Sequence, residues 1–165
     1  MTATPQDDSS AAGPERAVPR PRIPGPTATP AIADDGQCRR ILVVDDAATV
    51  RLYHGEILRR SGFVVDEAGN GLEAIELVLR IRYDLALVDV NMPQLDGYGL
   101  VRRLRTPPFE VSHPIVMAST ENTRSAVAAS YRVGANSYLV KPVAPARLVS
   151  LARLLTSSAA LGRPA

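Results

Sequence analysis

The chain lacks most of the features that mark secreted and membrane proteins. Cys38 is its only cysteine, so no intramolecular disulfide can form, and a lone thiol fits a reducing compartment. No apolar run approaches the roughly 18–20 residues that a membrane-spanning helix needs. The first ten residues, MTATPQDDSS, have neither a basic start nor an apolar core, which argues against an export signal. These absences predict a protein of the cytoplasm with no membrane partner.

Aromatic residues and excess charge are also scarce. The 165 residues include five Tyr, two Phe and no Trp, and the net charge is only +2. Basic and acidic residues are nearly balanced on both sides of residue 40, with five of each up to that point and fourteen against twelve beyond it. Because no basic stripe is interleaved with aromatic residues, the composition predicts no nucleic-acid partner.

Proline is concentrated at one end of the chain, where seven of the fourteen prolines lie within the first thirty residues. The stretch PRPRIPGPTATP has almost no large apolar side chains, so it cannot bury enough surface to offset the entropy lost on ordering. We predict that residues 1–37 form a disordered tail with polyproline character. This tail could be a spacer, a ligand for a partner domain, or an extension upstream of the true start codon. One globular domain is expected over residues 38–157, followed by a short flexible C-terminus at 158–165.

Within the expected domain, short apolar runs alternate with helical patterns. The runs are Ile41–Val44, Phe63–Glu67, Leu85–Val88, Ile115–Ala118 and Tyr138–Val140. All but the second are continuous, as expected for strands buried on both faces. Apolar residues at helical spacing follow each run: Val50, Tyr53, Ile57 and Leu58; Leu72, Ile75 and Leu79; Leu100, Val101 and Leu104; the Ala-rich segment 123–133; and Leu148, Leu151 and Leu155 after Pro145. This order predicts an α/β fold, a doubly wound five-stranded parallel sheet with helices on both faces.

Polar residues follow four of these runs directly. They are Asp45 and Asp46, Asp89, Ser119 and Lys141. Because ligands of open α/β sheets bind beyond the carboxyl ends of the strands, we expect all five side chains to meet at one edge. Three carboxylates at one point repel one another, and a hard cation such as Mg²⁺ would relieve that repulsion. A metal ion, a lysine and a hydroxyl around one carboxylate suit a phosphoryl group, whose transfer needs positioning and charge neutralisation.

The segments ILVVDD, LALVDVNMPQLDG, PIVMAST and YLVKP resemble, in this order, the receiver domain of bacterial two-component response regulators. The resemblance covers about residues 39–156. The spacings agree with that family: 43 residues separate Asp46 from Asp89, 30 separate Asp89 from Ser119, and 22 separate Ser119 from Lys141. Several motifs in the correct order are more specific than any single motif. The resemblance implies a flavodoxin-like fold with strand order 2-1-3-4-5.

The resemblance also implies a role for each residue of the site. Asp89 is the expected phosphoacceptor, and Lys141 and Ser119 are expected to contact oxygens of its phosphoryl group. The expected Mg²⁺ ligands are the carboxylates of Asp46 and Asp89, the backbone carbonyl of Asn91, and Asp45 through a metal-bound water. The bond between Lys141 and Pro142 is expected to be cis, as it often is in this family.

Further residues match positions that tune the response of receiver domains. Tyr138 matches the aromatic switch residue, which swings inward when the hydroxyl residue moves toward the phosphate, although simple core packing is an alternative. Ser119 stands where Thr is commoner, and the β-branched Thr120 follows where Ala or Gly is usual, so Thr120 is expected to narrow access to the site. Thr120 could instead be the switch hydroxyl, but the spacing to the lysine favours Ser119. Asn91 and Glu121 agree with chemotaxis regulators, in which they favour fast self-dephosphorylation.

Together these residues predict a stand-alone receiver rather than an enzyme, one that catalyses only its own phosphorylation and dephosphorylation. A histidine kinase would supply the phosphate. The face formed by the fourth helix, fifth strand and fifth helix would then bind an output protein, such as a flagellar motor switch, as a monomer or as a phosphorylation-dependent dimer. Two alternatives use the same site: a phosphorelay intermediate or sink that exchanges phosphate with a phosphotransfer protein, and the partner of a phytochrome-like kinase.

An aspartyl-phosphate phosphatase is the alternative that the sequence favours least. Haloacid-dehalogenase-like phosphatases carry their nucleophile in an early D-x-D-x-T motif, whereas Asp89 follows the third strand in D-V-N-M-P. His54 and His113 lack the spacing of metal ligands, so we assign them to surface or helix positions.

Overall fold

The computed structural model describes the backbone of residues 38–160 and the side chains of residues 38–157. The predicted tail, residues 1–37, and the last five residues of the predicted C-terminus lie outside the described residues, so the expectations for them stay untested. Within the described part of the chain, no helix is long and apolar enough to cross a membrane.

Five strands and five helices alternate along the described residues. The strands are β1 (Arg40–Val44), β2 (Val64–Ala68), β3 (Leu85–Asp89), β4 (Ile115–Ser119) and β5 (Ser137–Val140). The helices are α1 (Ala48–Arg60), α2 (Gly71–Arg80), α3 (Gly97–Leu104), α4 (Arg124–Arg132) and α5 (Pro145–Ala160). The sheet is parallel throughout, with the strand order β2-β1-β3-β4-β5. Both the predicted α/β class and the predicted order 2-1-3-4-5 are therefore confirmed.

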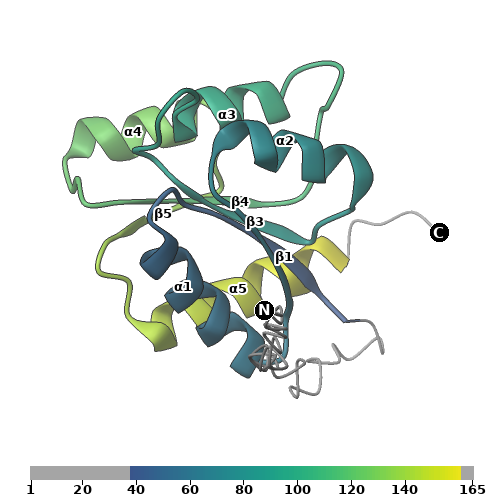
Figure 1. Ribbon diagram of the computed structural model, residues 1–165. Coiled ribbons are helices and arrows are strands. Elements are labelled where there is room, and N and C mark those ends of the chain that lie inside the picture. Colours follow the sequence, from purple (N-terminus) through teal and green to yellow (C-terminus); the bar gives the residue numbers. More distant parts are fainter. Residues whose placement is uncertain (1–37, 161–165) are drawn as a thin grey trace, which may run out of the picture.

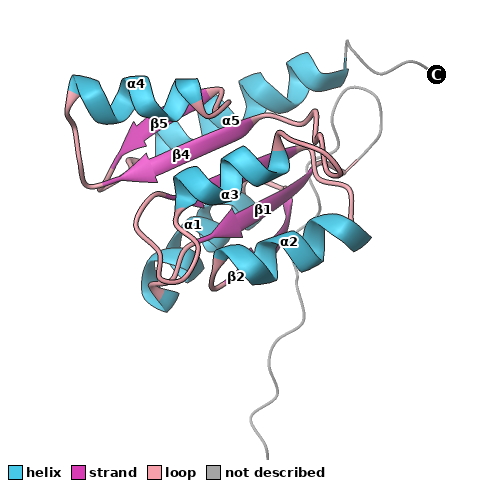
Figure 2. Ribbon diagram, turned by 90° about the horizontal axis from the view of Figure 1, so that it is seen from above, coloured by secondary structure: helices cyan, strands magenta, loops and turns pink. Residues whose placement is uncertain are grey.

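Helices cover both faces of the sheet, α1 and α5 on one side and α2, α3 and α4 on the other (Figure 1). Seen from above, α2, α3 and α4 lie over the sheet in one layer (Figure 2). Each face has its own apolar core, and successive residues of β1 alternate between them. Leu42 and Val44 pack under α2, α3 and α4, while Ile41 and Val43 pack against α1 and α5. Because both faces of the central strands are covered, their sequences are apolar without interruption.

Two of the predicted helical stripes are wrong in part. In α2 the predicted stripe included Leu72 and Leu79, but these side chains are 46% and 67% exposed. Gly71 and Ala74 are buried instead, because small residues let the helix lie close to the sheet. The face of α2 that packs on the sheet is therefore centred on small residues and not on Leu72 and Leu79.

In α1, Tyr53 was predicted to belong to the buried stripe, but its side chain is half exposed. The neighbouring His54, assigned to the surface or to a helix, does lie in α1 but is only 3% exposed, so the surface assignment is wrong. Burial and the nearby positive charge of Lys141 lower the pKa of His54. A neutral imidazole tolerates burial better than a charged one, and the spacing of apolar residues alone did not indicate which face of α1 would be covered.

A half-buried arginine joins two loops at the amino-terminal edge of the sheet. Arg105, at the end of α3, donates hydrogen bonds to the carbonyl oxygens of Val111, His113 and Gly134 and to the side chain of Asn136. Burial lowers the pKa of this guanidinium. The contacts fix the loop before β4 against the loop before β5, far along both strands from their carboxyl ends.

Candidate functional site

The carboxyl ends of four strands meet at one edge of the sheet, as the sequence predicted. In the parallel register, Val44 of β1 pairs with Val88 of β3, Asp89 of β3 pairs with Ala118 of β4, and Ser119 of β4 pairs with Val140 of β5. The residues at or just beyond these strand ends are therefore neighbours although they are far apart in sequence.

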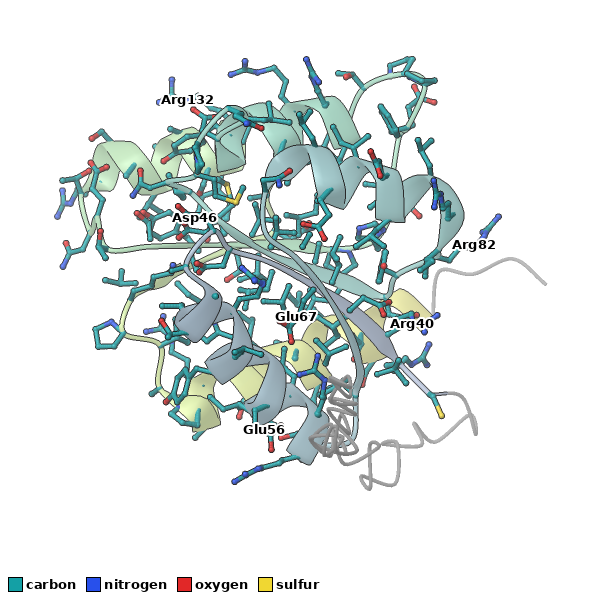
Figure 3. All side chains as sticks on the ribbon, in the orientation of Figure 1. Arg40, Asp46, Glu56, Glu67, Arg82 and Arg132 are labelled. Atoms are coloured by element: carbon teal, nitrogen blue, oxygen red, sulfur yellow. The ribbon has the colours of Figure 1, made fainter. Side chains whose placement is uncertain are left out.

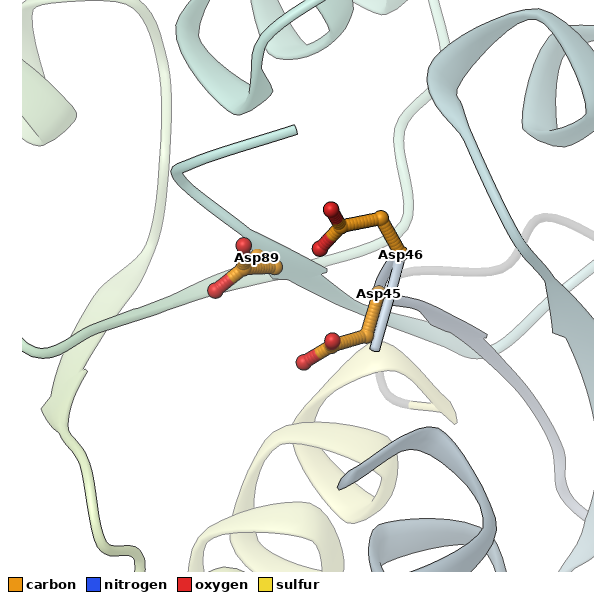
Figure 4. A group of neighbouring side chains, drawn as sticks. All are labelled: Asp45, Asp46 and Asp89. Atoms are coloured by element: carbon orange, nitrogen blue, oxygen red, sulfur yellow. The ribbon is translucent and has the colours of Figure 1, made fainter. Parts of the chain in front are cut away.

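Three carboxylates form the centre of this edge. One oxygen from each of Asp45, Asp46 and Asp89 lies within 4.8 Å of the others. Figure 4 shows Asp45 and Asp46 at the end of β1 and Asp89 at the end of β3, all directed into the same space. Asp45 and Asp89 are only 2% and 5% exposed, whereas Asp46 is exposed. The cluster thus has two buried members and one that faces solvent.

Lys141 bridges the two buried carboxylates. Its Nζ lies 2.6 Å from Oδ2 of Asp45 and 2.5 Å from Oδ1 of Asp89. Burial raises the pKa of Asp89 above its usual value, and the contact with Lys141 opposes this rise without cancelling it. For Lys141 burial acts in the opposite direction, but the hydrogen bonds to Asp45 and Asp89 outweigh it and raise the pKa of the lysine. Lys141 therefore stays charged across the physiological range.

The donor set of the cluster fits a hard divalent cation. With the three carboxylates ionised and Lys141 charged, two excess negative charges remain, which a divalent ion would balance. Asp45 uses both carboxylate oxygens within the protein, since Oδ1 accepts a hydrogen bond from the backbone N–H of Ala47 and Oδ2 accepts one from Lys141. The exposed Asp46 is the most accessible of the three. The backbone N–H of Asn91 donates to Oδ2 of Asp89, and Asn91 itself is exposed beside it.

The loop after β4 is held by two of the predicted switch residues. The Oγ of the fully buried Ser119 accepts a hydrogen bond from the backbone N–H of Glu121 at 3.1 Å. The hydroxyl of Tyr138, whose ring is buried, donates to the backbone carbonyl of the same Glu121 at 2.7 Å. Thr120 and Glu121, which follow Ser119 in the chain, are exposed. The bond between Lys141 and Pro142 is cis, as expected.

Gly97 brings the first turn of α3 against the phosphoacceptor candidate. Its backbone N–H donates to the carbonyl of Val90, and a Cβ atom at this position would collide with the carbonyl oxygen of Asp89. Glycine is needed here because two backbone segments approach closely. The loop between β3 and α3 is thereby folded back onto the end of β3.

Sequence reasoning missed two residues that adjoin this site. Arg51 of α1 donates from Nη1 to the backbone carbonyl of Asp45 at 2.6 Å, and its Nε lies 3.4 Å from Oε2 of Glu67. Glu67 is near the carboxyl end of β2, the one strand whose polar end residues were not included in the predicted site. The rule that located the other site residues would have located Glu67 as well.

Comparison with known proteins agrees with this arrangement. The family model for the response regulator receiver domain matches residues 41–153. The gliding motility regulatory protein of Myxococcus xanthus is 41% identical over 106 residues, which are 62% of this chain and 13% of that protein. The chemotaxis protein CheY of Thermotoga maritima is 30% identical over 112 residues, which are 67% of this chain and 92% of that protein.

The solved structures include the chemotaxis protein CheY4 of Vibrio cholerae, which is similar with a TM-score of 0.67 and 31% sequence identity, over 71% of this chain and 98% of that one. The chain spans between 13% and 62% of the length of several curated relatives, so those relatives contain further segments. The family match, the strand order and the acidic strand-end cluster lead to one conclusion: the chain belongs to the family of response regulator receiver domains, which are signalling modules of two-component systems.

Proposed function

We propose that this chain is a phosphorylation switch in which Asp89 accepts a phosphoryl group from a histidine kinase. The observation that carries the proposal is the position of Lys141, whose ammonium group lies 2.5 Å from Asp89 and 2.6 Å from Asp45. The buried Asp89 is thus paired with a cation that can move to an incoming phosphoryl oxygen. A divalent metal fits the cluster that surrounds it, as described above.

In the proposed reaction, a carboxylate oxygen of Asp89 attacks phosphorus, forming a new O–P bond. The P–N bond to the histidine of the kinase breaks, and the imidazole nitrogen keeps the electron pair. Asp45, Asp46, Asp89 and the carbonyl of Asn91 would hold Mg²⁺, which when bound supplies positive charge to the phosphoryl oxygens. Lys141 and the hydroxyl of Ser119 would contact the remaining oxygens.

The response would reach the partner surface through the loop after β4. Ser119 and Tyr138 hold the N–H and the carbonyl of Glu121, respectively, so the two side chains share one restraint. If Ser119 turns toward the phosphoryl group, its bond to the N–H of Glu121 is lost and the loop is free to move. Tyr138 lies on β5, so this movement would alter the face made by α4, β5 and α5.

The chemistry of that face suggests the kind of output partner. Exposed apolar side chains occur on each of its elements: Tyr131 on α4, Val140 on β5 and Leu154 on α5. From residue 122 to the end, the sequence has no Asp or Glu, and every charged residue is Arg or Lys. An acidic protein with apolar anchor residues fits this face, and a symmetric contact with a second copy would bring like charges together.

Labelling with acetyl phosphate and Mg²⁺ tests the proposal. The wild-type protein should gain one phosphoryl group that is sensitive to hydroxylamine, as expected for an acyl phosphate, and Asp89→Asn should gain none. Asp96→Asn is a matched control, since this exposed residue only caps α3. Labelling of Asp89→Asn at the wild-type level would contradict the assignment of Asp89 as the phosphoacceptor. Phosphotransfer from purified histidine kinases would then identify the donor, and onward transfer to a phosphotransfer protein would distinguish a relay from a terminal switch.

A further inference from the structure

A series of charged side chains connects β2 to the turn that carries Asp45 and Asp46. Arg59 of α1 donates from Nη2 to Oε1 of Glu67 at 2.7 Å, and the other oxygen of Glu67 faces Nε of Arg51 at 3.4 Å. Arg51 in turn donates to the backbone carbonyl of Asp45 at 2.6 Å. Figure 3 shows Glu67 on the side of α1 that faces the sheet, while Glu56 lies on its outer side.

The turn between β1 and α1 is held by the bond from the N–H of Ala47 to Oδ1 of Asp45, but the start of the helix has no side-chain cap of its own. The residue that precedes α1 is Ala47, which offers no side-chain cap, and the first turn of the helix has no acidic residue. Such a helix start lacks the restraint that Ser, Thr, Asp or Asn would give. Arg51 supplies a restraint from within the helix, by reaching back to the carbonyl of Asp45.

We propose that Arg51 is a positioning residue, anchored by Glu67, that holds the turn of Asp45 and Asp46 in the geometry that binds the divalent metal. The proposal rests on the proposed function, because the metal site belongs to it. With the bond from Arg51, all four polar groups of Asp45 are engaged: its N–H donates to Ala68, and its carboxylate meets Ala47 and Lys141. Asp46 follows directly, so its direction depends on how the peptide of Asp45 is held.

Glu67 also offsets the positive charge of Arg51. A guanidinium beside a metal site would repel the ion, and the carboxylate of Glu67, held in place by Arg59, reduces that repulsion. Gly55 leaves the room that this arrangement needs, because a Cβ atom there would lie 2.9 Å from both Nη1 of Arg59 and Oε1 of Glu67. The network is thus built into the packing of α1 against β2.

Arg51→Ala separates positioning from charge, because it removes both the restraint and a positive charge, and the two effects change Mg²⁺ binding in opposite directions. Glu67→Gln keeps Arg51 but removes both its ionic anchor and the negative charge that offsets it. If Arg51 acted through its charge alone, Arg51→Ala would tighten Mg²⁺ binding. If it acts by positioning, both variants should bind Mg²⁺ more weakly, by about tenfold for Arg51→Ala, as is usual when a residue that orients a metal ligand is lost. Arg51→Lys should recover part of the loss.

The experiment measures the dissociation constant of Mg²⁺ by calorimetry in the absence of any phosphodonor, with folding checked by urea unfolding. Arg60→Ala is the control, since Arg60 pairs with the exposed Glu56 on the surface of α1. In acetyl phosphate labelling, the half-saturating Mg²⁺ concentration should rise with the dissociation constant, while the rate at saturating Mg²⁺ should change much less.

A dissociation constant for Arg51→Ala that equals the wild-type value or lies below it overturns the proposal. Should Arg51→Ala fail to fold, Arg59→Ala decides, because it removes a positive charge together with the partner that holds Glu67. Weaker Mg²⁺ binding there supports positioning, and an unchanged or tighter dissociation constant overturns the proposal. Failure of the proposed function looks different, because the wild-type protein itself would then bind no Mg²⁺ or leave Asp89 unlabelled.

Discussion

Replacing Asp89 with Asn should abolish phosphorylation and, in the same step, stabilise the folded protein. Asp89 is 5% exposed, and burial raises the pKa of its carboxyl, so the folded state holds the ionised form less readily than the unfolded chain does. In its ionised form this carboxylate is therefore held in the fold at a cost in free energy. A neutral side chain of the same shape removes that cost.

The distances give the size of the effect. Two unit charges 4.8 Å apart, the upper limit for Asp89 with Asp45 or Asp46, repel by about 3.5 kcal/mol at an effective dielectric constant near 20. The ammonium of Lys141, 2.5 Å away, attracts Asp89 by about 6–7 kcal/mol on the same scale. The two repulsions and the attraction nearly cancel, so desolvation of the carboxylate dominates. We expect Asp89→Asn to raise the free energy of unfolding by about 1–2 kcal/mol and the melting temperature by about 3–8 °C.

Urea and thermal unfolding at pH 7 in EDTA measure this difference, with Glu56→Gln as the control that removes one exposed carboxylate. Added Mg²⁺ supplies a second signature. At a Mg²⁺ concentration a hundred times the dissociation constant, the ion should stabilise the wild-type protein by about 2.7 kcal/mol and Asp89→Asn by much less. The difference in unfolding free energy between the two proteins should therefore shrink or change sign. A variant that is less stable than wild type in EDTA would refute the reasoning, since it would mean that the Lys141 contact outweighs burial and repulsion.

Three further predictions concern other parts of the fold. Burial lowers the pKa of His113 to about 4, so its contribution to stability is complete above about pH 6.5 and is lost as the pH falls through 4. His113→Gln should therefore reduce the acid-side loss of unfolding free energy by up to about 3 kcal/mol, and an unchanged profile would contradict this. Arg105→Ala removes the bonds that join two loops and should cost about 2–4 kcal/mol in urea unfolding, against less than about 0.5 for the exposed Arg103→Ala. Gly97→Ala should slow acetyl phosphate labelling of Asp89 by about tenfold or more, since its Cβ displaces the carbonyl of that residue; wild-type labelling rates would rule out this effect.

The sequence was sufficient for the architecture because one strong signal dominates it. Uninterrupted apolar runs such as Leu85–Val88 require cover on both faces, and alternation with helices then leaves a parallel sheet as the consistent arrangement. The same logic located the site, because polar residues directly after buried strands must gather at one edge. Asp45, Asp89 and Lys141 were found in this way although 96 positions separate the first from the last.

The errors arose where packing, rather than pattern, decides the outcome. Leu79 and His54 exchange the exposures expected for their residue types, because small neighbours determine how closely α2 and α1 approach the sheet. The long reach of Arg51 and Arg105 was also hidden. An arginine contacts a backbone carbonyl through a flexible side chain, and no spacing in the sequence marks that contact. Only the folded chain shows which carbonyls lie within reach.

The two hydrogen bonds to the backbone of Glu121 have a consequence for which substitutions this position tolerates. Ser119 and Tyr138 grip only its backbone N–H and carbonyl, while its exposed carboxylate accepts a hydrogen bond from Thr123. Any amino acid with a free N–H could occupy this position without disturbing the two bonds. Mutation is therefore free to change this exposed side chain, while the backbone bonds that join the loop to Ser119 and to Tyr138 of β5 are retained.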